Sequence, residues 1–259
     1  MLKLQTSNFI ALFTIIRHEL KRITRIWPQT FLPPVITMTL YFLIFGNLIG
    51  SRIGLMDGIS YVTFIAPGLI IMSIITNAYS NVSASFFSIR FQRSVEELIV
   101  SPAASHVILL GYISGGILRG LLVGLGVTLI ALFFTKLSIY NWPMLVVTVL
   151  LSSILFSLFG FTNALYAKKF DDIAIIPTFI LTPLSYLGGV FYSIDLLPAF
   201  WYQISLFNPI LYIVNAFRYS FLGVSDVNLL LALAMIFLIT VGFFIFNLML
   251  LNKGIGIRQ

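Results

Sequence analysis

The chain has 259 residues, of which 59% are hydrophobic and 9% are charged, and its formal net charge at pH 7 is +7. A soluble domain carries about 25% charged residues, so this composition excludes a globular protein whose whole surface faces water. The basic residues cluster at the ends of apolar runs, where membrane orientation explains them better than nucleic-acid binding does. The sequence lacks cysteine, which excludes disulfides, thiolate metal sites and a cysteine nucleophile.

The first 27 residues carry basic side chains ahead of a long apolar run and show no signal peptide with a cleavage site. One helical stripe, with spacings of three and four, is formed by Phe9, Phe13, Ile16, Leu20, Ile23 and Trp27. The basic residues off this stripe are Arg17, His18, Lys21, Arg22 and Arg25. The pattern predicts an amphipathic helix over residues 7–26 that lies in the membrane interface, with its cations toward anionic lipid head groups. The alternative is a soluble start of the first span.

Six stretches are long enough for transmembrane helices, each of which needs about 20 apolar residues. We place these spans at residues 29–49, 61–85, 107–134, 144–166, 173–192 and 228–251. The charge-free stretch 196–217 contains Pro198, Asn208 and Pro209, so we interpret it as a re-entrant or interfacial helical hairpin. A seventh span is the alternative.

The distribution of Lys and Arg distinguishes six spans from seven. With six spans and a cytoplasmic N-terminus, eleven cations lie in cytoplasmic segments: Lys3, Arg17, Lys21, Arg22, Arg25, Arg90, Arg93, Lys168, Lys169, Lys253 and Arg258. Three lie in outer segments: Arg52, Lys136 and Arg218. This positive-inside bias favours six spans, because a seventh would move Lys253 and Arg258 outside. We therefore expect one all-α membrane domain over residues 1–259, with both termini in the cytoplasm of a bacterial cell.

Motifs for catalysis and for nucleotide binding are missing from the sequence. It contains no phosphate-binding loop of the form G-x-x-x-x-G-K-[ST] and no G-x-S-x-G elbow, and its two histidines are far apart. The acidic pairs Glu96–Glu97 and Asp171–Asp172 fall in connections beside basic residues, where solvated loop charges are the default interpretation. We expect a chain that is not an enzyme and that binds no cofactor or metal of its own.

Arg119 is the charge placed deepest in a predicted span, roughly 18 Å from its start at the helical rise. A charge near the middle of a bilayer is costly and should face protein or water. It belongs to a glycine-rich run that includes Gly116 and Gly120, whose spacing allows close helix contact. We expect Arg119, Gly116 and Gly120 to serve the transport pathway or a dimer interface. The alternatives are a snorkelling or carbonyl-bonded arginine and glycines that face lipid.

The second connection, between residues 90 and 106, is long enough for a short amphipathic helix that ends at Pro102. Its apolar side chains are Val95, Leu98 and Ile99, and its charged side chains include Arg93, Glu96 and Glu97. A helix of this kind suits docking to a partner, because the apolar residues can fill a groove while the charges set register. An ordinary solvated loop is the alternative.

Three segments of the chain resemble the ABC-2 type permeases, the membrane subunits of a class of bacterial ABC exporters. They are the WPQTFLPPVITMTLYFLIFG run at residues 27–46, the EELIVSPAASHVILLGY run at residues 96–112 and the late region at residues 177–223. The late region carries the most specific part of the resemblance, which is the set Gly188–Gly189, Pro198, Asn208–Pro209 and Arg218. The resemblance covers essentially the full length and is nearest to permeases that work with a separately encoded ATPase.

The resemblance implies a homodimer of permeases with two copies of a cytoplasmic ABC ATPase, which would bind the ATP and Mg²⁺. It also implies that residues 91–105 form a coupling helix and that residues 194–220 form a re-entrant hairpin near the outer surface. Members of this family export drugs, polysaccharides, lipid-linked glycans and other amphipathic molecules. An ion-coupled secondary transporter is the alternative function, but it would need titratable residues at the membrane midplane, where the sequence places only Arg119.

Overall fold

The computed structural model describes residues 2–56, 58–92 and 103–255, and their side chains except those of residues 2–7, 47 and 51. Almost all of this chain is helical. The elements in chain order are α1 (Leu2–Arg25), α2 (Trp27–Tyr41), η1 (Phe42–Ile49), α3 (Gly50–Ile53), β1 (Leu55–Met56), β2 (Ile59–Ser60), α4 (Tyr61–Phe91), α6 (Ser105–Phe134), α7 (Trp142–Tyr166), α8 (Phe170–Ile176), η2 (Pro177–Leu181), α9 (Thr182–Leu187), η3 (Ile194–Leu196), α10 (Ala199–Leu206), α11 (Pro209–Leu222) and α12 (Leu229–Asn252).

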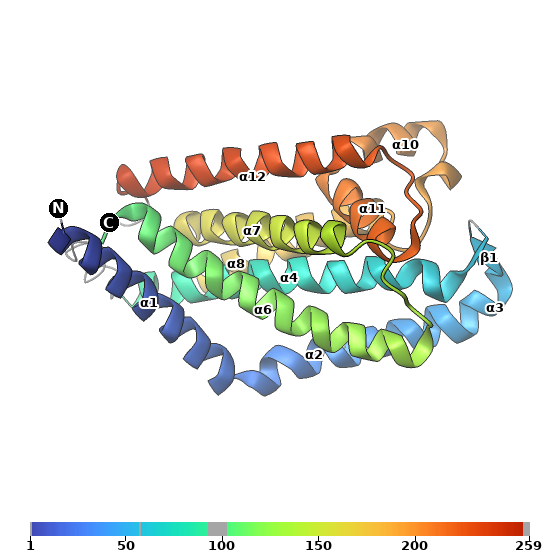
Figure 1. The fold of residues 1–259 in the computed structure, drawn as a ribbon, viewed down its shortest axis with the longest axis horizontal. Helices are drawn as coiled ribbons and strands as arrows, with labels where there is room; N and C mark the ends of the chain where they lie inside the picture. The colour runs from blue at the N-terminus through green and yellow to red at the C-terminus, as the bar shows by residue number, and fades with distance from the viewer. Residues whose placement is uncertain (1, 57, 93–102, 256–259) are drawn as a thin grey trace.

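Six helices are long and apolar enough to cross a membrane, as predicted. They are Trp27–Gly46, Tyr61–Phe91, Ser105–Phe134, Trp142–Tyr166, Phe170–Leu187 and Leu229–Asn252. They run alternately in opposite directions, so that α1 begins and α12 ends at the same end of the bundle (Figure 1). The last residues of α4, the first residues of α6 and the connection between α7 and α8 lie at this end, which we call the terminal end. The short antiparallel β1–β2 hairpin, α3, α10 and α11 lie at the opposite end.

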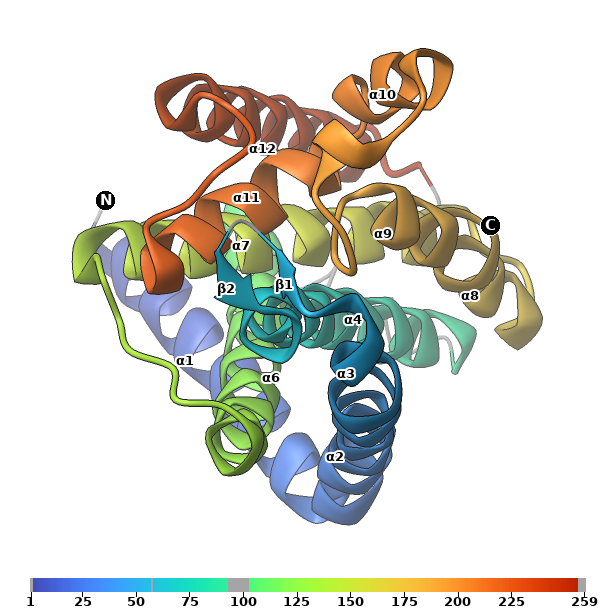
Figure 2. The same cartoon turned by 90° about the vertical axis from the view of Figure 1, so that its right-hand side faces the viewer.

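The centre of the bundle is α4, which is surrounded by α2, α6, α7 and α8 when the molecule is viewed along the spans (Figure 2). In the most apolar stretch of this span, 78% is buried inside the protein, and this is the largest share among the six candidate spans. Glycines permit the close approach: a Cβ atom added to Gly160 of α7 would overlap the backbone carbonyl oxygen of Tyr79. Packing of α4, α6 and α7 therefore depends on backbone contacts that larger residues would prevent.

The glycine-rich run of α6 has two faces with different partners. A Cβ atom at Gly111 would lie 2.7 Å from Ile15 Cγ2 of α1, and one at Gly120 would lie 3.1 Å from the carbonyl oxygen of Ile74 of α4. One side of α6 thus receives α1, and another side receives α4. The predicted close helix contact exists, and it is made within the chain.

The helix α1 runs obliquely to the spans, as Figure 1 shows, and one of its faces packs on the bundle. Ile15, Glu19 and Ile23 on this face are buried, whereas Phe9 and Phe13 are 73% and 60% exposed. The apolar stripe was predicted for a helix in the membrane interface. Ile23 departs from this prediction, because its side chain contacts protein. A position of α1 in the membrane interface stays a prediction.

The predicted hairpin at residues 194–220 contains two short helices, α10 and α11, joined at Asn208. Nearly every side chain of α11 is buried, while Phe200 and Phe207 around α10 are 68% and 83% exposed. Asn208 caps α11 by accepting a hydrogen bond from the backbone amide of Ile210, and Pro209 follows at the first helical position. The break is thus enclosed by protein on the α11 side, and its depth in a membrane stays a prediction.

Arg90, near the end of α4, binds the end of α7. Its Nη1 atom donates to the carbonyl oxygens of Ala164, Leu165 and Ala167, each at 2.8 Å. The last carbonyls of a helix lack partners within the helix, and a cation there also complements the helix dipole. Arg90 thereby fixes the α7–α8 connection beside the end of α4. The predicted coupling helix at residues 91–105 lies largely outside the described residues, which here include only Phe91, Gln92 and residues 103–105.

We expect Gly160→Val to lower the free energy of unfolding by about 3 kcal/mol, because overpacking a tight contact forces the backbones apart. The matched control is Gly242→Val in α12, where an added Cβ atom meets nothing within 4 Å. Thermal unfolding in detergent measures both variants. Equal melting temperatures for the two variants would contradict the close packing of α7 against α4.

Candidate functional site

A polar cavity lies among α2, α4 and α6, near the middle of α4 and α6. Its volume is about 320 Å³. The polar lining residues come from all three helices and are Gln29, Thr37, Ser73, Thr76, Asn77 and Arg119. The others are Pro33, Pro34, Met38, Tyr41 and Met72. Polar groups gathered between apolar spans mark binding or transport sites more often than structural ones, so this cavity is the first candidate site.

Arg119 reaches the cavity because of the glycines around it. Gly116 and Gly120 are buried: a Cβ atom on Gly116 would overlap Ser157 of α7, and one on Gly120 would crowd Ile74 of α4. These glycines hold α6 against the bundle, and Arg119 lies beside this contact, where α2 does not fill the space. Gly116 and Gly120 make close contacts inside the subunit, and a role of this run in the transport pathway or a dimer interface stays a prediction.

The guanidinium of Arg119 has few partners within the described part of the chain. Its Nε atom is buried and makes no hydrogen bond there. The ion pairs among the described residues are Glu19–Arg22 and Arg218–Asp226, and neither includes Arg119. The described contacts include no hydrogen bond from Arg119 to a carbonyl oxygen of its own span. They therefore do not support the alternative of a carbonyl-bonded arginine.

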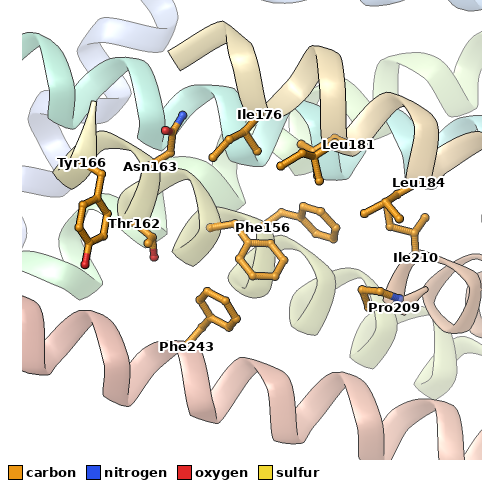
Figure 3. A pocket seen from close by; sticks show the side chains of 12 residues that line it. Phe156, Thr162, Asn163, Tyr166, Ile176, Leu181, Leu184, Pro209, Ile210 and Phe243 are labelled. Carbon is orange, nitrogen blue, oxygen red and sulfur yellow. The ribbon is translucent and has the colours of Figure 1, made fainter. Parts of the chain in front are cut away.

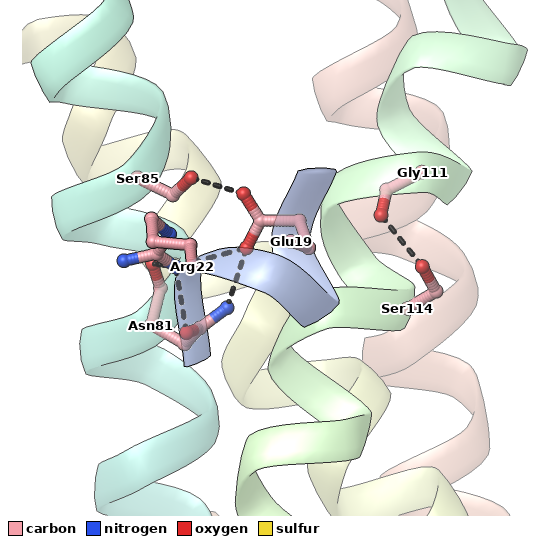
Figure 4. A network of polar contacts seen from close by, with 6 residues as sticks. All are labelled: Glu19, Arg22, Asn81, Ser85, Gly111 and Ser114. Carbon is pink, nitrogen blue, oxygen red and sulfur yellow. Dashed lines mark hydrogen bonds and ion pairs between the residues drawn. The ribbon is translucent and has the colours of Figure 1, made fainter. Parts of the chain in front are cut away.

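A second polar cluster joins α1 to α4 (Figure 4). Glu19 is fully buried, and its Oε2 atom lies 2.8 Å from Arg22 Nη2 and 3.0 Å from the amide nitrogen of Asn81. Ser85 donates to the other carboxylate oxygen, and Arg22 also donates to Asn81 Oδ1 at 2.7 Å. The two charges therefore neutralise each other inside a closed network, and this network fastens α1 to the central span.

This cluster was not predicted from the sequence. Arg22 was expected to face lipid head groups, but it points inward, and its side chain is only 16% exposed. The correction has a local cause, because Glu19 and Arg22 are three residues apart and thus lie on one face of α1. The available signal was Glu19 itself, the only acidic residue in an otherwise basic helix.

At the end opposite the termini, the structure brings together all of the residues predicted for the outer hairpin. The amide of Asn208 donates to the carbonyl oxygen of Leu184 at 2.6 Å, and a Cβ atom on Gly188 would lie 2.9 Å from Ile210 Cγ2. Gly189 has a positive φ of 72°, a conformation that favours glycine. Pro209 begins α11 directly behind this contact.

Arg218 of α11 lies at the centre of this cluster and is fully buried. It donates to the carbonyl oxygen of Gly189, its Cζ atom lies 3.9 Å from the ring centroid of Phe64, and its Nη1 atom lies 3.8 Å from Asp226. Arg218 therefore bonds a carbonyl near the helix break, and its side chain is enclosed by protein.

An apolar pocket of about 340 Å³ lies among α7, α8–α9, α11 and α12. Phe156, Phe243 and Leu181 line its middle, and Thr162, Asn163 and Tyr166 of α7 lie at one end (Figure 3). Asn163 donates to the hydroxyl of Tyr79, and Thr162 donates to Asn247 Oδ1. Since Thr162 and Asn163 already have partners, the pocket offers mainly apolar surface.

The residues predicted to contact an ATPase lie outside the described residues. They are Arg93, Val95, Glu96, Glu97, Leu98, Ile99 and Pro102. The described helices that flank this segment in the sequence are α4 and α6, and the end of α4 and the start of α6 lie at the terminal end of the bundle.

We expect Glu19→Ala to lower the free energy of unfolding by about 3 kcal/mol, because it leaves the half-buried Arg22 without its carboxylate. The double variant Glu19→Ala/Arg22→Met should recover part of this loss, since no unpaired charge then remains. Thermal unfolding in detergent provides the comparison. Additive effects of the two single substitutions would show that the pair is not coupled.

Comparison with known proteins places this geometry in a family. The family described as ABC-2 type transporter matches residues 10–222. The inner membrane transport permease YadH of Escherichia coli strain K12 is 54% identical over 251 residues, which cover 97% of this chain and 98% of that permease. Nodulation protein J of Rhizobium leguminosarum bv. viciae is 26% identical over 219 residues, or 83% of each chain. Nodulation protein J of Rhizobium meliloti strain 1021 is 22% identical over 188 residues, or 71% of each chain.

The predicted resemblance is confirmed by these matches. Six apolar helices and the likeness to an inner-membrane permease together support a multi-pass protein of the inner membrane. The family match covers most of the chain, and the identity to the Escherichia coli permease extends over nearly all of it. The chain therefore belongs to the ABC-2 type transporter family and is a membrane subunit of a transport system.

Proposed function

We propose that this chain is the membrane subunit of an ATP-driven exporter, which works as a homodimer with two copies of a separate cytoplasmic ABC ATPase. The substrate is an amphipathic, lipid-linked, glycan or drug-like molecule that leaves the cytoplasm or the inner leaflet. The observation that carries this proposal is the polar cavity around Arg119, located among spans of a chain that belongs to a transport family. Arg119 then faces the transport pathway.

The proposed orientation places the terminal end in the cytoplasm. Most of the described cations assigned to cytoplasmic segments lie at or near this end, among them Arg17, Arg90, Lys168 and Lys253, whereas Arg52 lies at the other end. Positive charge is retained on the cytoplasmic side of inner-membrane proteins, so the distribution supports this orientation. It also places the segment 93–102 where a cytoplasmic ATPase can reach it.

Energy enters the proposed exporter through the ATPase, which binds ATP and Mg²⁺. The sequence contains no phosphate-binding loop, so contact with another subunit has to transmit the work. The connection between α4 and α6 is the longest one at the terminal end. Because α4 is the central span, a force applied at its end acts directly on the helices around the cavity.

One observation bears on the alternative of an ion-coupled transporter, and it is the buried carboxylate of Glu19. An ion-coupled carrier uses carboxylates that load and release a proton or cation during transport. Glu19 is held by an ion pair with Arg22 and by hydrogen bonds from Asn81 and Ser85. These contacts indicate that Glu19 attaches α1 to α4. We therefore propose the ATPase-driven mechanism and not the ion-coupled one.

We expect a reporter fused after Gln259 to behave as a cytoplasmic protein. The reason is the positive-inside bias together with the shared end of α1 and α12. Paired fusions of alkaline phosphatase and green fluorescent protein report the side. A matched fusion in the β1–β2 turn should give the opposite result. Alkaline phosphatase activity from the C-terminal fusion would contradict the proposed orientation.

We expect Glu96→Lys/Glu97→Lys to weaken ATPase binding or to uncouple ATP hydrolysis from transport, because the substitution reverses charge at the proposed docking segment. Co-purification with the ATPase and ATP hydrolysis in liposomes measure these effects. Asp171→Lys is the control, since Asp171 is an exposed carboxylate in the first turn of α8, beside the other connection at the terminal end. Normal ATPase binding and transport by the double variant would show that coupling enters elsewhere.

A further inference from the structure

We infer that the cavity around Arg119 binds the anionic group of an amphipathic molecule, such as a phosphate, sulfate or carboxylate that is joined to an apolar tail. This inference rests on the proposed function and names the substrate class of the same site. Three features of the described residues support it: the charge of Arg119, the neutral polar lining around it, and the size of the cavity together with the apolar surface at its mouth.

The first feature is an uncompensated positive charge. Arg119 lies at the middle of α6, where water is scarce and an isolated charge is costly. The ion pairs among the described residues are Glu19–Arg22 and Arg218–Asp226, so no described carboxylate pairs with Arg119. The surroundings of Arg119 therefore favour a negative ligand over a neutral or positive one.

The second feature is the chemistry of the lining. Gln29, Thr37, Thr76 and Asn77 carry neutral side chains that can donate hydrogen bonds, and no carboxylate lies among the described lining residues. Ser73 and Asn77 also bond carbonyls of their own helix, which fixes their orientation. An oxyanion could therefore receive a charge-assisted hydrogen bond from Arg119 and further bonds from amides and hydroxyls.

The third feature is the size and the opening of the cavity. A volume of about 320 Å³ exceeds what a single phosphate group needs, and it lies at the lower end of the range for ligand pockets. The α2 side chains at the mouth, Gln29, Pro33 and Thr37, are exposed. The neighbouring side chains of α2 are apolar and also exposed, at 50% for Leu32 and 55% for Ile36. A head group inside the cavity would therefore have its tail along an apolar helix face.

The contrast with the pocket of Figure 3 strengthens this assignment. That pocket lies on the other side of the bundle, among α7, α8–α9, α11 and α12, and its polar residues Thr162 and Asn163 have partners in the chain. An apolar tail alone would find more apolar surface there. The cavity around Arg119 differs by offering a charge together with apolar surface, so an anionic amphiphile satisfies both parts of it.

The test measures binding of radiolabelled short-chain phosphatidylglycerol to the purified full-length chain in a neutral detergent. We expect saturable binding that dodecyl phosphate displaces, whereas phosphatidylcholine with the same tails and inorganic phosphate do not. Arg119→Gln should weaken the affinity about tenfold or more, as expected for the loss of a charge-assisted hydrogen bond in an enclosed site. Arg119→Lys should retain part of the affinity, because it keeps the charge without the forked geometry.

Two further variants separate the site from general effects. Arg52→Gln removes an exposed cation of α3 and should leave binding unchanged, which controls for non-specific attraction of anions. Asn77→Asp places a carboxylate inside the cavity and should abolish binding even if Arg119→Gln fails to fold. Unchanged affinity in Arg119→Gln and Asn77→Asp would overturn the inference. Equal displacement by inorganic phosphate would overturn the requirement for an apolar tail.

The same preparations are tested for co-purification with the ATPase, which distinguishes this inference from the proposed function. Absence of saturable binding by a chain that does retain its ATPase overturns the inference alone. Saturable, Arg119-dependent binding by a chain that retains no ATPase supports the inference and counts against the ATP-driven mechanism. Association with the ATPase should persist in Arg119→Gln, because this residue is far from the connection between α4 and α6.

Discussion

The approach of α6 and α7 to α4 is the contact on which the rest of the structure depends. Gly116 and Gly160 lack side chains where the neighbouring helices meet the central span, so the backbones come into van der Waals contact. This packing fixes the rotation of each helix about its axis and thereby the direction in which its other residues point. It turns Arg119 toward α2, and it presents Gly111 and Gly115 to α1. In lipid, where apolar surface gives helices little reason to associate, contacts of this kind stabilise the bundle.

Polar groups at the two ends of the bundle are satisfied within the chain. Arg90 binds the last carbonyls of α7 at the terminal end, and Arg218 binds Gly189 at the other end. Glu19 and Arg22 of α1 also find partners within the chain, because they form an ion pair with each other. A bilayer offers few hydrogen bonds, so helix ends and inward charges need partners from the protein. The cavity around Arg119 departs from this rule, and such departures coincide with function more often than with structure.

The sequence was sufficient to predict the six spans, because a mean hydropathy this high leaves few alternatives for long charge-free stretches. It also predicted the helix break at Asn208–Pro209, where proline lacks an amide donor. It could not predict which face of α6 meets which partner, because Gly111, Gly115, Gly116 and Gly120 fit the same small-residue spacing. The direction of Arg22 was predicted wrongly, since a basic helix near a membrane favours outward cations unless a buried acid such as Glu19 turns one inward.

Arg218, which is buried, and Arg119, which is partly buried, show that an inward-facing charge does not by itself define a site. Arg218 is surrounded by the Gly189 carbonyl, the Phe64 ring and the Asp226 carboxylate, all from its own chain. These groups compensate its charge and leave no path for a ligand, so Arg218 holds α11 against the bundle. Arg119 lies beside a cavity whose described lining contains no carboxylate. The two arginines differ in whether the fold itself supplies the opposite charge. Around Arg218 it does, whereas around Arg119 a molecule that enters from outside supplies it.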